Sequence, residues 1–131
     1  MIARAVKCAA LAVALLPALA VAAAANCTVY QHRDYGGAHW YIRDGAYLAG
    51  VGAIPNLGCY GCPEVHYRPD WNDQISSFKV GPGCTIMLWQ HVDGSRSPPR
   101  GHGATFRSSR SVSFVGGRWN DQASLVHCRC R

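Results

Sequence analysis

The chain has 131 residues, of which 49% are hydrophobic and only 15% are charged, and its formal net charge is +6 at pH 7. This length and composition suit one folded domain and exclude a disordered tail protein. Beyond the N-terminus, no apolar run approaches the roughly 20 residues that span a bilayer, which excludes a polytopic membrane protein.

The N-terminal segment, residues 1–25, is predicted to be a secretory signal peptide. Arg4 and Lys7 make its start positive, an uncharged run follows, and alanines end it before Asn26. A basic start, an apolar middle and a small-residue end are typical of a cleaved export signal. The alternative is a membrane anchor, but Pro17 and the alanine-rich end favour cleavage. We therefore expect a secreted, extracellular or periplasmic protein, whose formal charge falls from +6 to +4 when the two N-terminal cations are lost.

Cleavage would also remove Cys8 and leave six cysteines. An even number of cysteines in a small exported domain indicates disulfides, which add stability where the core is only moderate. The sequence does not choose among the possible pairings. The cysteines concerned are Cys27, Cys59, Cys62, Cys84, Cys128 and Cys130. A redox or zinc pair at Cys59 and Cys62 is less favoured than a structural disulfide.

In chain order, the rest of the sequence predicts short β-strands separated by glycine-rich turns. The segments that alternate or cluster β-forming side chains are 27–31, 38–43, 75–80, 85–89, 104–106, 112–115 and 123–128. No segment after residue 25 has a sustained helical period. The sequence therefore predicts an all-β sandwich or barrel.

An internal repeat divides the chain into units at about 27–80 and 84–131. The two pairs of matching segments are 30–34 with 89–93 and 71–76 with 119–124. In the second pair, five of six residues are identical. The offset between the copies falls from 59 to 48 residues along the chain, so the first unit contains an insertion, which we place within 46–62.

The first unit contains two further patterns. Tyr30, Tyr35 and Gly37 place two aromatic residues and a glycine at a spacing that resembles the Greek-key signature of the βγ-crystallins. Residues 72–77 resemble the calcium motif of that superfamily, which has two Asn or Asp, two free positions and two hydroxyl residues. The resemblance covers nearly all of residues 26–131. It implies two Greek-key motifs that form one disulfide-stapled, βγ-crystallin-like sandwich.

The second unit departs from this pattern at several positions. Trp89 stands at the first aromatic position, Gly94 stands where Tyr35 would align, and residues 95–103 form a rebuilt hairpin tip with two prolines. The second calcium motif ends in Leu125 instead of serine.

The repeated loops concentrate the oxygen ligands that calcium prefers, which are carboxylates, carbonyls and hydroxyls. In each loop the Asp would supply charge, the Asn a side-chain carbonyl, the Gln a backbone carbonyl and the Ser a hydroxyl. The predicted ligands are Asn72, Asp73, Gln74, Ser76, Asn120, Asp121, Gln122 and Ser124. The resemblance implies that both sites lie at one end of the domain, each completed by backbone from the other unit. The alternative is that the Asn-Asp pairs only form Asx-turns.

The single carboxylate of each loop predicts weak calcium binding, with a dissociation constant of about 10⁻⁵ to 10⁻³ M. Because Leu125 offers no side-chain oxygen, we expect the second site to be the weaker one.

The predicted function is that of a secreted, monomeric, calcium-binding structural or stress protein without enzymatic activity, since no catalytic motif stands in a suitable context. The alternative is a peptidase inhibitor or killer-toxin-like antimicrobial protein on the same scaffold, which would bind its target through 46–62 and 95–103. Dispersed arginines argue against a nucleic-acid partner. The richest stretch, 96–110, is interpreted as a solubilising loop rather than an anion-attracting patch. Stable membrane insertion is not expected.

Overall fold

The structure is a computed structural model that describes residues 25–50, 61, 63–94 and 98–131. The signal-peptide prediction therefore falls outside the described residues but for Ala25, and so do Cys59 and Cys62. Within the described residues the fold is all-β, as predicted. Its strands are β1 (Asn26–Tyr30), β2 (His39–Arg43), β3 (Tyr47–Ala49), β4 (Val65–Tyr67), β5 (Ser77–Val80), β6 (Cys84–Asp93), β7 (Arg100–Ser108) and β8 (Leu125–Cys130). Two short 3-10 turns are η1 (Arg33–Tyr35) and η2 (Pro69–Trp71).

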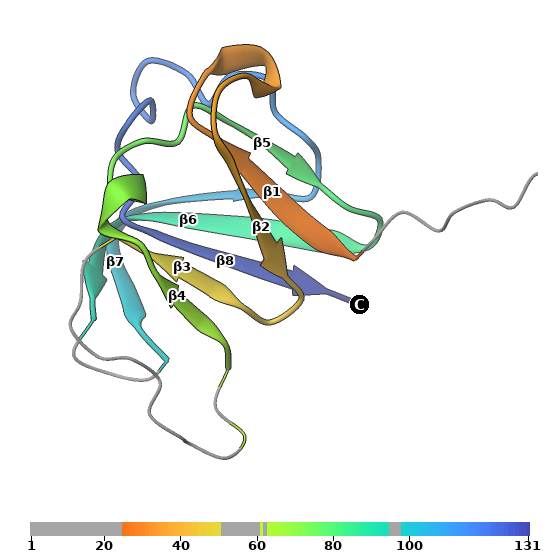
Figure 1. Ribbon diagram of the computed structural model, residues 1–131, viewed down its shortest axis with the longest axis vertical. Helices are drawn as coiled ribbons and strands as arrows, with labels where there is room; N and C mark the ends of the chain where they lie inside the picture. Colours follow the sequence, from red (N-terminus) through yellow and green to blue (C-terminus); the bar gives the residue numbers. More distant parts are fainter. Residues whose placement is uncertain (1–24, 51–60, 62, 95–97) are drawn as a thin grey trace, which may run out of the picture.

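The strands form two sheets that pack as layers (Figure 1). The small sheet has the order β2-β1-β5, and the large sheet has the order β4-β3-β8-β6-β7. No helix in the described ranges is long and apolar enough to cross a membrane.

Each repeat unit supplies chain to the sheet of the other unit. β3 belongs to the first unit, yet it pairs antiparallel with β8 of the second unit. In return, Val112 of the second unit pairs with Phe78 of β5, through backbone hydrogen bonds of 3.0 and 2.9 Å. The strand expected at 112–115 is therefore reduced to an isolated bridge, because only this one pair of residues forms a ladder contact.

The insertion in the first unit overlaps the predicted interval 46–62 but starts later and extends beyond it. β3 falls inside the expected interval 46–62, but it occupies the same topological position as Val112 in the second unit. The extra chain therefore begins after β3 and includes β4, which pairs parallel to β3 at the edge of the large sheet. Neither β3 nor β4 was among the predicted strands.

The core lies between the facing sides of the two sheets. Its largest side chains are at most 2% exposed, and burying each one stabilises the fold by roughly 1.5–3 kcal/mol. They include Val29, Ile42, Leu48, Phe78, Ile86, Leu88 and Val126. Phe106 extends the core, because its ring contacts those of Phe78 and Trp119 edge-on at 5.8 and 5.7 Å between centroids.

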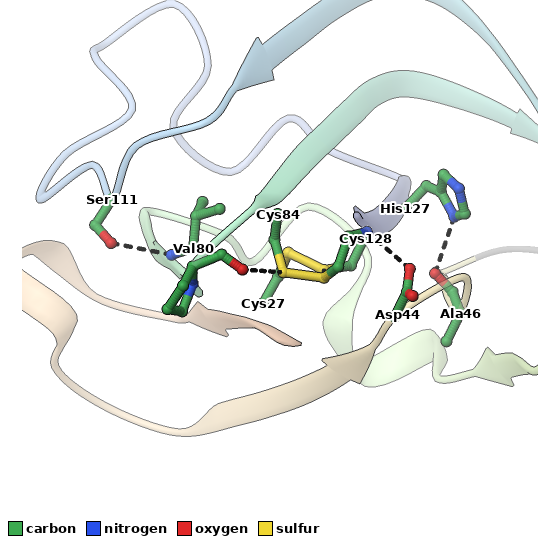
Figure 2. The surroundings of a disulfide bond; sticks show 10 residues. Cys27, Asp44, Ala46, Val80, Cys84, Ser111, His127 and Cys128 are labelled. Atoms are coloured by element: carbon green, nitrogen blue, oxygen red, sulfur yellow. Dashed lines mark hydrogen bonds between the residues drawn. A yellow bond between two sulfur atoms is a disulfide. The ribbon is translucent and has the colours of Figure 1, made fainter. Parts of the chain in front are cut away.

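Two disulfides close the end of the sandwich where β8 ends (Figure 2). The Cys27–Cys128 bond joins β1 of the small sheet to β8 of the large sheet. The Cys84–Cys130 bond joins β6 to β8 at positions that are directly paired in the ladder. The predicted disulfide stapling is thus confirmed for these four cysteines.

The Greek-key signature of the first unit forms a folded hairpin between β1 and β2. Asp34 and Tyr35 have left-handed backbones, with φ of 55° and 62°, and the Tyr35 ring meets that of Tyr30 edge-on at 5.6 Å. The Ser77 hydroxyl fixes this turn, because it donates to the carbonyl of His32 (2.6 Å) and accepts from the amide of Tyr35 (3.1 Å).

The corresponding hairpin of the second unit does not fold over in this way. β6 and β7 stay paired as far as Asp93 and Arg100, with an irregularity between Trp89 and His91. Trp89 packs so closely on Gly101 that a Cβ added there would lie 2.1 Å from the indole. The unusual residues of this hairpin therefore produce a long two-stranded ribbon.

Candidate metal centre

The two Asn-Asp loops, residues 72–76 and 120–124, lie side by side at the end of the sandwich opposite the disulfides. The first loop precedes β5 and the second precedes β8. Their backbones are joined reciprocally, since the amide of Asp73 donates to the carbonyl of Ala123 (3.0 Å) and the amide of Asp121 donates to the carbonyl of Ile75 (3.2 Å). The structure thus brings the predicted ligands from both units to one place.

Both aspartates adopt a left-handed backbone conformation, with φ of 55° at Asp73 and 56° at Asp121. This region is uncommon for residues other than glycine, and Asp is one of the few that tolerate it. Each carboxylate reaches across to the opposite loop. Asp121 Oδ1 lies 3.4 Å from the Ser76 hydroxyl, and Asp73 Oδ1 lies 3.4 Å from the Ser124 hydroxyl.

Each candidate site therefore combines the carboxylate of one loop with the hydroxyl of the other. We refer to them as the Asp121–Ser76 site and the Asp73–Ser124 site. Spacing within one loop could not show this exchange, because residues that are neighbours in sequence contribute to different sites.

The proton of the Ser76 hydroxyl distinguishes the two sites. Ser76 Oγ lies 2.8 Å from the carbonyl oxygen of Gln31, which is a shorter contact than the 3.4 Å to Asp121. A hydroxyl has one proton, and the shorter bond is the stronger. With that proton directed to Gln31, a lone pair of Ser76 faces the carboxylate of Asp121. Two oxygen atoms that face each other without a proton between them suit a cation.

The asparagines supply a second sign that the loops suit a cation. The Oδ1 atoms of Asn72 and Asn120 are buried, and no hydrogen bond reaches either of them within the part of the chain described. An unsatisfied buried acceptor costs about 1–3 kcal/mol. The Asn120 amide nitrogen contacts Asp121 Oδ2 at 3.3 Å.

The backbone carbonyls of Gln74 and Gln122 are also available as ligands. Both side chains are exposed, and the amides of both residues close their loops by donating to the carbonyls of Trp71 (3.3 Å) and Trp119 (3.1 Å), respectively. In the described residues, neither glutamine carbonyl accepts a hydrogen bond. The donor set is thus carboxylate, amide carbonyl, backbone carbonyl and hydroxyl oxygens, which are the ligands of a hard cation such as Ca²⁺.

The sixth position of each motif has another role. Ser77 begins β5, and its hydroxyl bonds to the backbone of the folded hairpin, while Leu125 is fully buried in the large sheet. We expected a weaker second site because Leu125 has no hydroxyl. That reason does not hold, since the hydroxyl of Ser77, the equivalent residue of the first unit, is engaged in bonds to His32 and Tyr35.

Gln31 belongs to the candidate centre although the sequence did not identify it. Its carbonyl receives the Ser76 hydroxyl, and the neighbouring carbonyl of Tyr30 receives the Ser76 amide at 3.0 Å. In the second unit, the carbonyl of Trp89 receives the Ser124 amide at 2.9 Å. The repeated aromatic-Gln-His sequence was the available signal, because the carbonyl of its aromatic residue accepts the serine amide in each unit, at the end of β1 and within β6.

The chain is a sandwich of two repeat units that exchange strands, and its paired Asn-Asp loops lie at one end. These features define a class of small β-proteins. Solved structures of this class resemble the chain, and they show that its fold is that of the βγ-crystallin domains. The N-terminal domain of protein S is 24% identical, with a TM-score of 0.54, over 81% of this chain and 97% of that chain. A βγ-crystallin domain from Clostridium beijerinckii is 21% identical, with a TM-score of 0.53, over 79% and 97%.

A third similar structure is the βγ-crystallin domain of Abundant Perithecial Protein from Neurospora crassa in its Ca²⁺-bound form. It is 15% identical, with a TM-score of 0.53, over 82% of this chain and 91% of that chain. No protein-family model and no curated protein matches the chain. The resemblance seen in the sequence is therefore confirmed at the level of the fold.

Proposed function

We propose that the protein is a secreted calcium-binding βγ-crystallin-type domain in which Ca²⁺ holds the two repeat units together. The observation that carries this proposal is the reciprocal approach of Asp121 to Ser76 and of Asp73 to Ser124. The unpartnered carbonyl oxygens of the adjacent asparagines support it, and so does the Ca²⁺-bound form of the Neurospora domain. When bound, the ion would supply positive charge between groups that otherwise present only oxygen lone pairs.

We expect the Asp121–Ser76 site to bind calcium more tightly than the Asp73–Ser124 site. Ser76 is only 4% exposed, and its proton is directed to Gln31, so its lone pair is oriented before the ion arrives. Ser124 is more exposed, and Asp73 is the only acceptor that its hydroxyl has in the described part of the chain. Its proton must move away from Asp73 before a cation can bind there.

Thermal unfolding of oxidised residues 26–131 tests calcium binding. At a calcium concentration of about 100 times the dissociation constant, the ion should stabilise the fold by roughly 2.7 kcal/mol, a shift of several degrees in Tm for a domain of this size. Magnesium at the same concentration controls for ionic strength. Equal Tm values with millimolar calcium, with magnesium and with chelator would reject the proposal.

A double-mutant cycle tests the cross-loop pairing. In saturating calcium, the losses of folding stability caused by Asp121→Asn and by Ser76→Ala should be non-additive, because both substitutions remove ligands from one site. The matched pair Asp121→Asn and Ser124→Ala should be closer to additive, although Ser124 is nearer to Asp121 in sequence. The opposite pattern of coupling would mean that each loop binds its own ion.

The peptidase-inhibitor or toxin alternative stays a prediction, because residues 51–60, 62 and 95–97 of its two proposed binding loops lie outside the described residues. A panel of extracellular peptidases and a microbial growth assay test it. Monomeric behaviour also stays a prediction, which sedimentation would check.

A further inference from the structure

A basic groove lies on the outer face of the large sheet, at the end that carries the disulfides. It has a volume of about 480 Å³ and is lined by Gly83, Thr85, Met87, Arg107, Arg129, Arg131 and Cys130. Its position is remote from the candidate metal centre, because β8 runs from Leu125 beside the Asn-Asp loops to Cys130 at the groove. The groove therefore raises a question separate from calcium binding.

Strand register explains how the arginines come together. β6 lies between β7 and β8, and its residues Thr85 and Met87 face outward because Cys84, Ile86 and Leu88 face the core. Met87 pairs with Arg107 of β7, and Thr85 pairs with Arg129 of β8. Paired residues share a face of a sheet, so the two arginines stand on either side of a floor made by Thr85 and Met87.

Among the described residues, no side-chain carboxylate forms an ion pair with these arginines. All seven carboxylate side chains of the sequence belong to described residues, and none of them lines the groove. The ion pairs observed within the described ranges join Glu64 to His66 and Arg68 to Asp70. The nearby Asp44 is engaged by the backbone amide of Cys130, whose nitrogen lies 2.7 Å from Oδ1.

We propose that this groove binds a phosphate or sulfate group that carries at least two negative charges. Guanidinium groups bind such oxyanions through two parallel N–H donors. Their planar shape makes this bidentate contact possible, whereas the ammonium of lysine acts as a point charge. The Thr85 hydroxyl is an additional donor on the floor, and Met87 supplies apolar contact. The ligand can be a free anion or the headgroup of an anionic lipid, which share this chemistry.

His127 provides a local reporter of binding. It pairs with Met87 on the same outer face, and its ring stacks on Tyr47 with 4.0 Å between centroids. Burial lowers the pKa of His127, and the charge of Arg129 lowers it too, while the hydrogen bond to Ala46 and the charge of Asp44 oppose these effects. An anion held by Arg129 would offset that positive charge, so the pKa of His127 should rise when the groove is occupied.

The test is a titration of oxidised residues 26–131 with inorganic pyrophosphate in calcium-free buffer, followed by NMR of the arginine side chains and of His127. We expect saturable shifts at Arg107 and Arg129, a higher His127 pKa, and about a tenfold loss of affinity in Arg129→Gln. The matched control is Arg100→Gln, which removes the same charge from the far end of β7, about 23 Å from Arg107. Its affinity should change less than twofold.

Vesicles of phosphatidylcholine with and without phosphatidic acid distinguish the two sources of the anion. Binding to pyrophosphate alone supports a soluble ligand, and additional binding to the phosphatidic acid vesicles that is lost in Arg129→Gln supports a headgroup. Equal losses of affinity in Arg129→Gln and in Arg100→Gln would overturn the proposal, since they would mean that the anion is attracted only by the net charge of the protein. The proposal would also be overturned if the protein bound neither pyrophosphate nor the phosphatidic acid vesicles.

Discussion

Removing the bond that joins the two sheets should lower the free energy of unfolding by about 4 kcal/mol. The perturbation is the double substitution Cys27→Ala with Cys128→Ala, which leaves no unpaired thiol behind. These residues are 101 positions apart, and both side chains are fully buried. A crosslink that closes a loop of about 100 residues stabilises by about 4.7 kcal/mol through the entropy of the unfolded chain.

The second disulfide reduces this figure slightly. When the Cys84–Cys130 bond is intact, it shortens the path along the unfolded chain from Cys27 to Cys128. The Cys27–Cys128 bond then closes an effective loop of about 60 residues and stabilises the fold by about 4.2 kcal/mol. The same relation gives about 4.0 kcal/mol for Cys84–Cys130, which closes 46 positions. Cys84 is buried as well, but Cys130 is only partly buried, so we expect the removal of Cys27 and Cys128 to cost the more of the two.

Urea unfolding at 25 °C in chelator, followed by tryptophan fluorescence, measures both losses. The control is Cys84→Ala with Cys130→Ala, which breaks a bond between two strands that stay hydrogen-bonded as neighbours. A loss below about 2 kcal/mol for the Cys27 and Cys128 pair would refute the reasoning, because it would mean that packing alone holds the sheets together.

Two further predictions concern single positions. Because burial lowers the folded-state pKa of His127, the unfolded chain binds a proton more readily, so the free energy of unfolding should fall as pH drops below about 6.5. Urea midpoints between pH 5 and 7.5 should show this slope in the native chain and in His39→Gln but a smaller one in His127→Gln. Gly50→Ala would place a Cβ 2.6 Å from Asn72 Cβ and Oδ1, which should cost about 1–3 kcal/mol and weaken calcium binding. Gly117→Ala, where nothing lies within 4 Å, should leave Tm and calcium affinity nearly unchanged, and equal effects of the two substitutions would contradict the steric argument.

Local patterns in the sequence predicted most of the strands and the positions of both Asn-Asp loops. Residues 27–31 and 38–43 alternate or cluster β-forming side chains, and the observed β1 and β2 differ from them by one residue at the ends. The three-residue strands β3 and β4 were missed because they are too short to show a period. Their pairing depends on partners that are distant in the chain.

Long-range geometry also explains what the sequence could not show of the sites. The motif indicated which residues bear oxygen ligands, but only the packing of the loops shows that Asp121 faces Ser76 rather than Ser124. Likewise, Arg107 and Arg129 are far apart in a sequence whose arginines look dispersed, and strand register brings them to one face.

The exchange of chain between the repeat units has a consequence for their independence. Without β3, β8 would have an unpaired edge, and without Val112, β5 would lose its outer neighbour. Exposed edges of this kind pair readily with another chain. We therefore expect that half of this sequence, produced alone, could complete its sheet only by borrowing from a second copy. The covalent link between the halves turns what would be a concentration-dependent assembly into a single folding event.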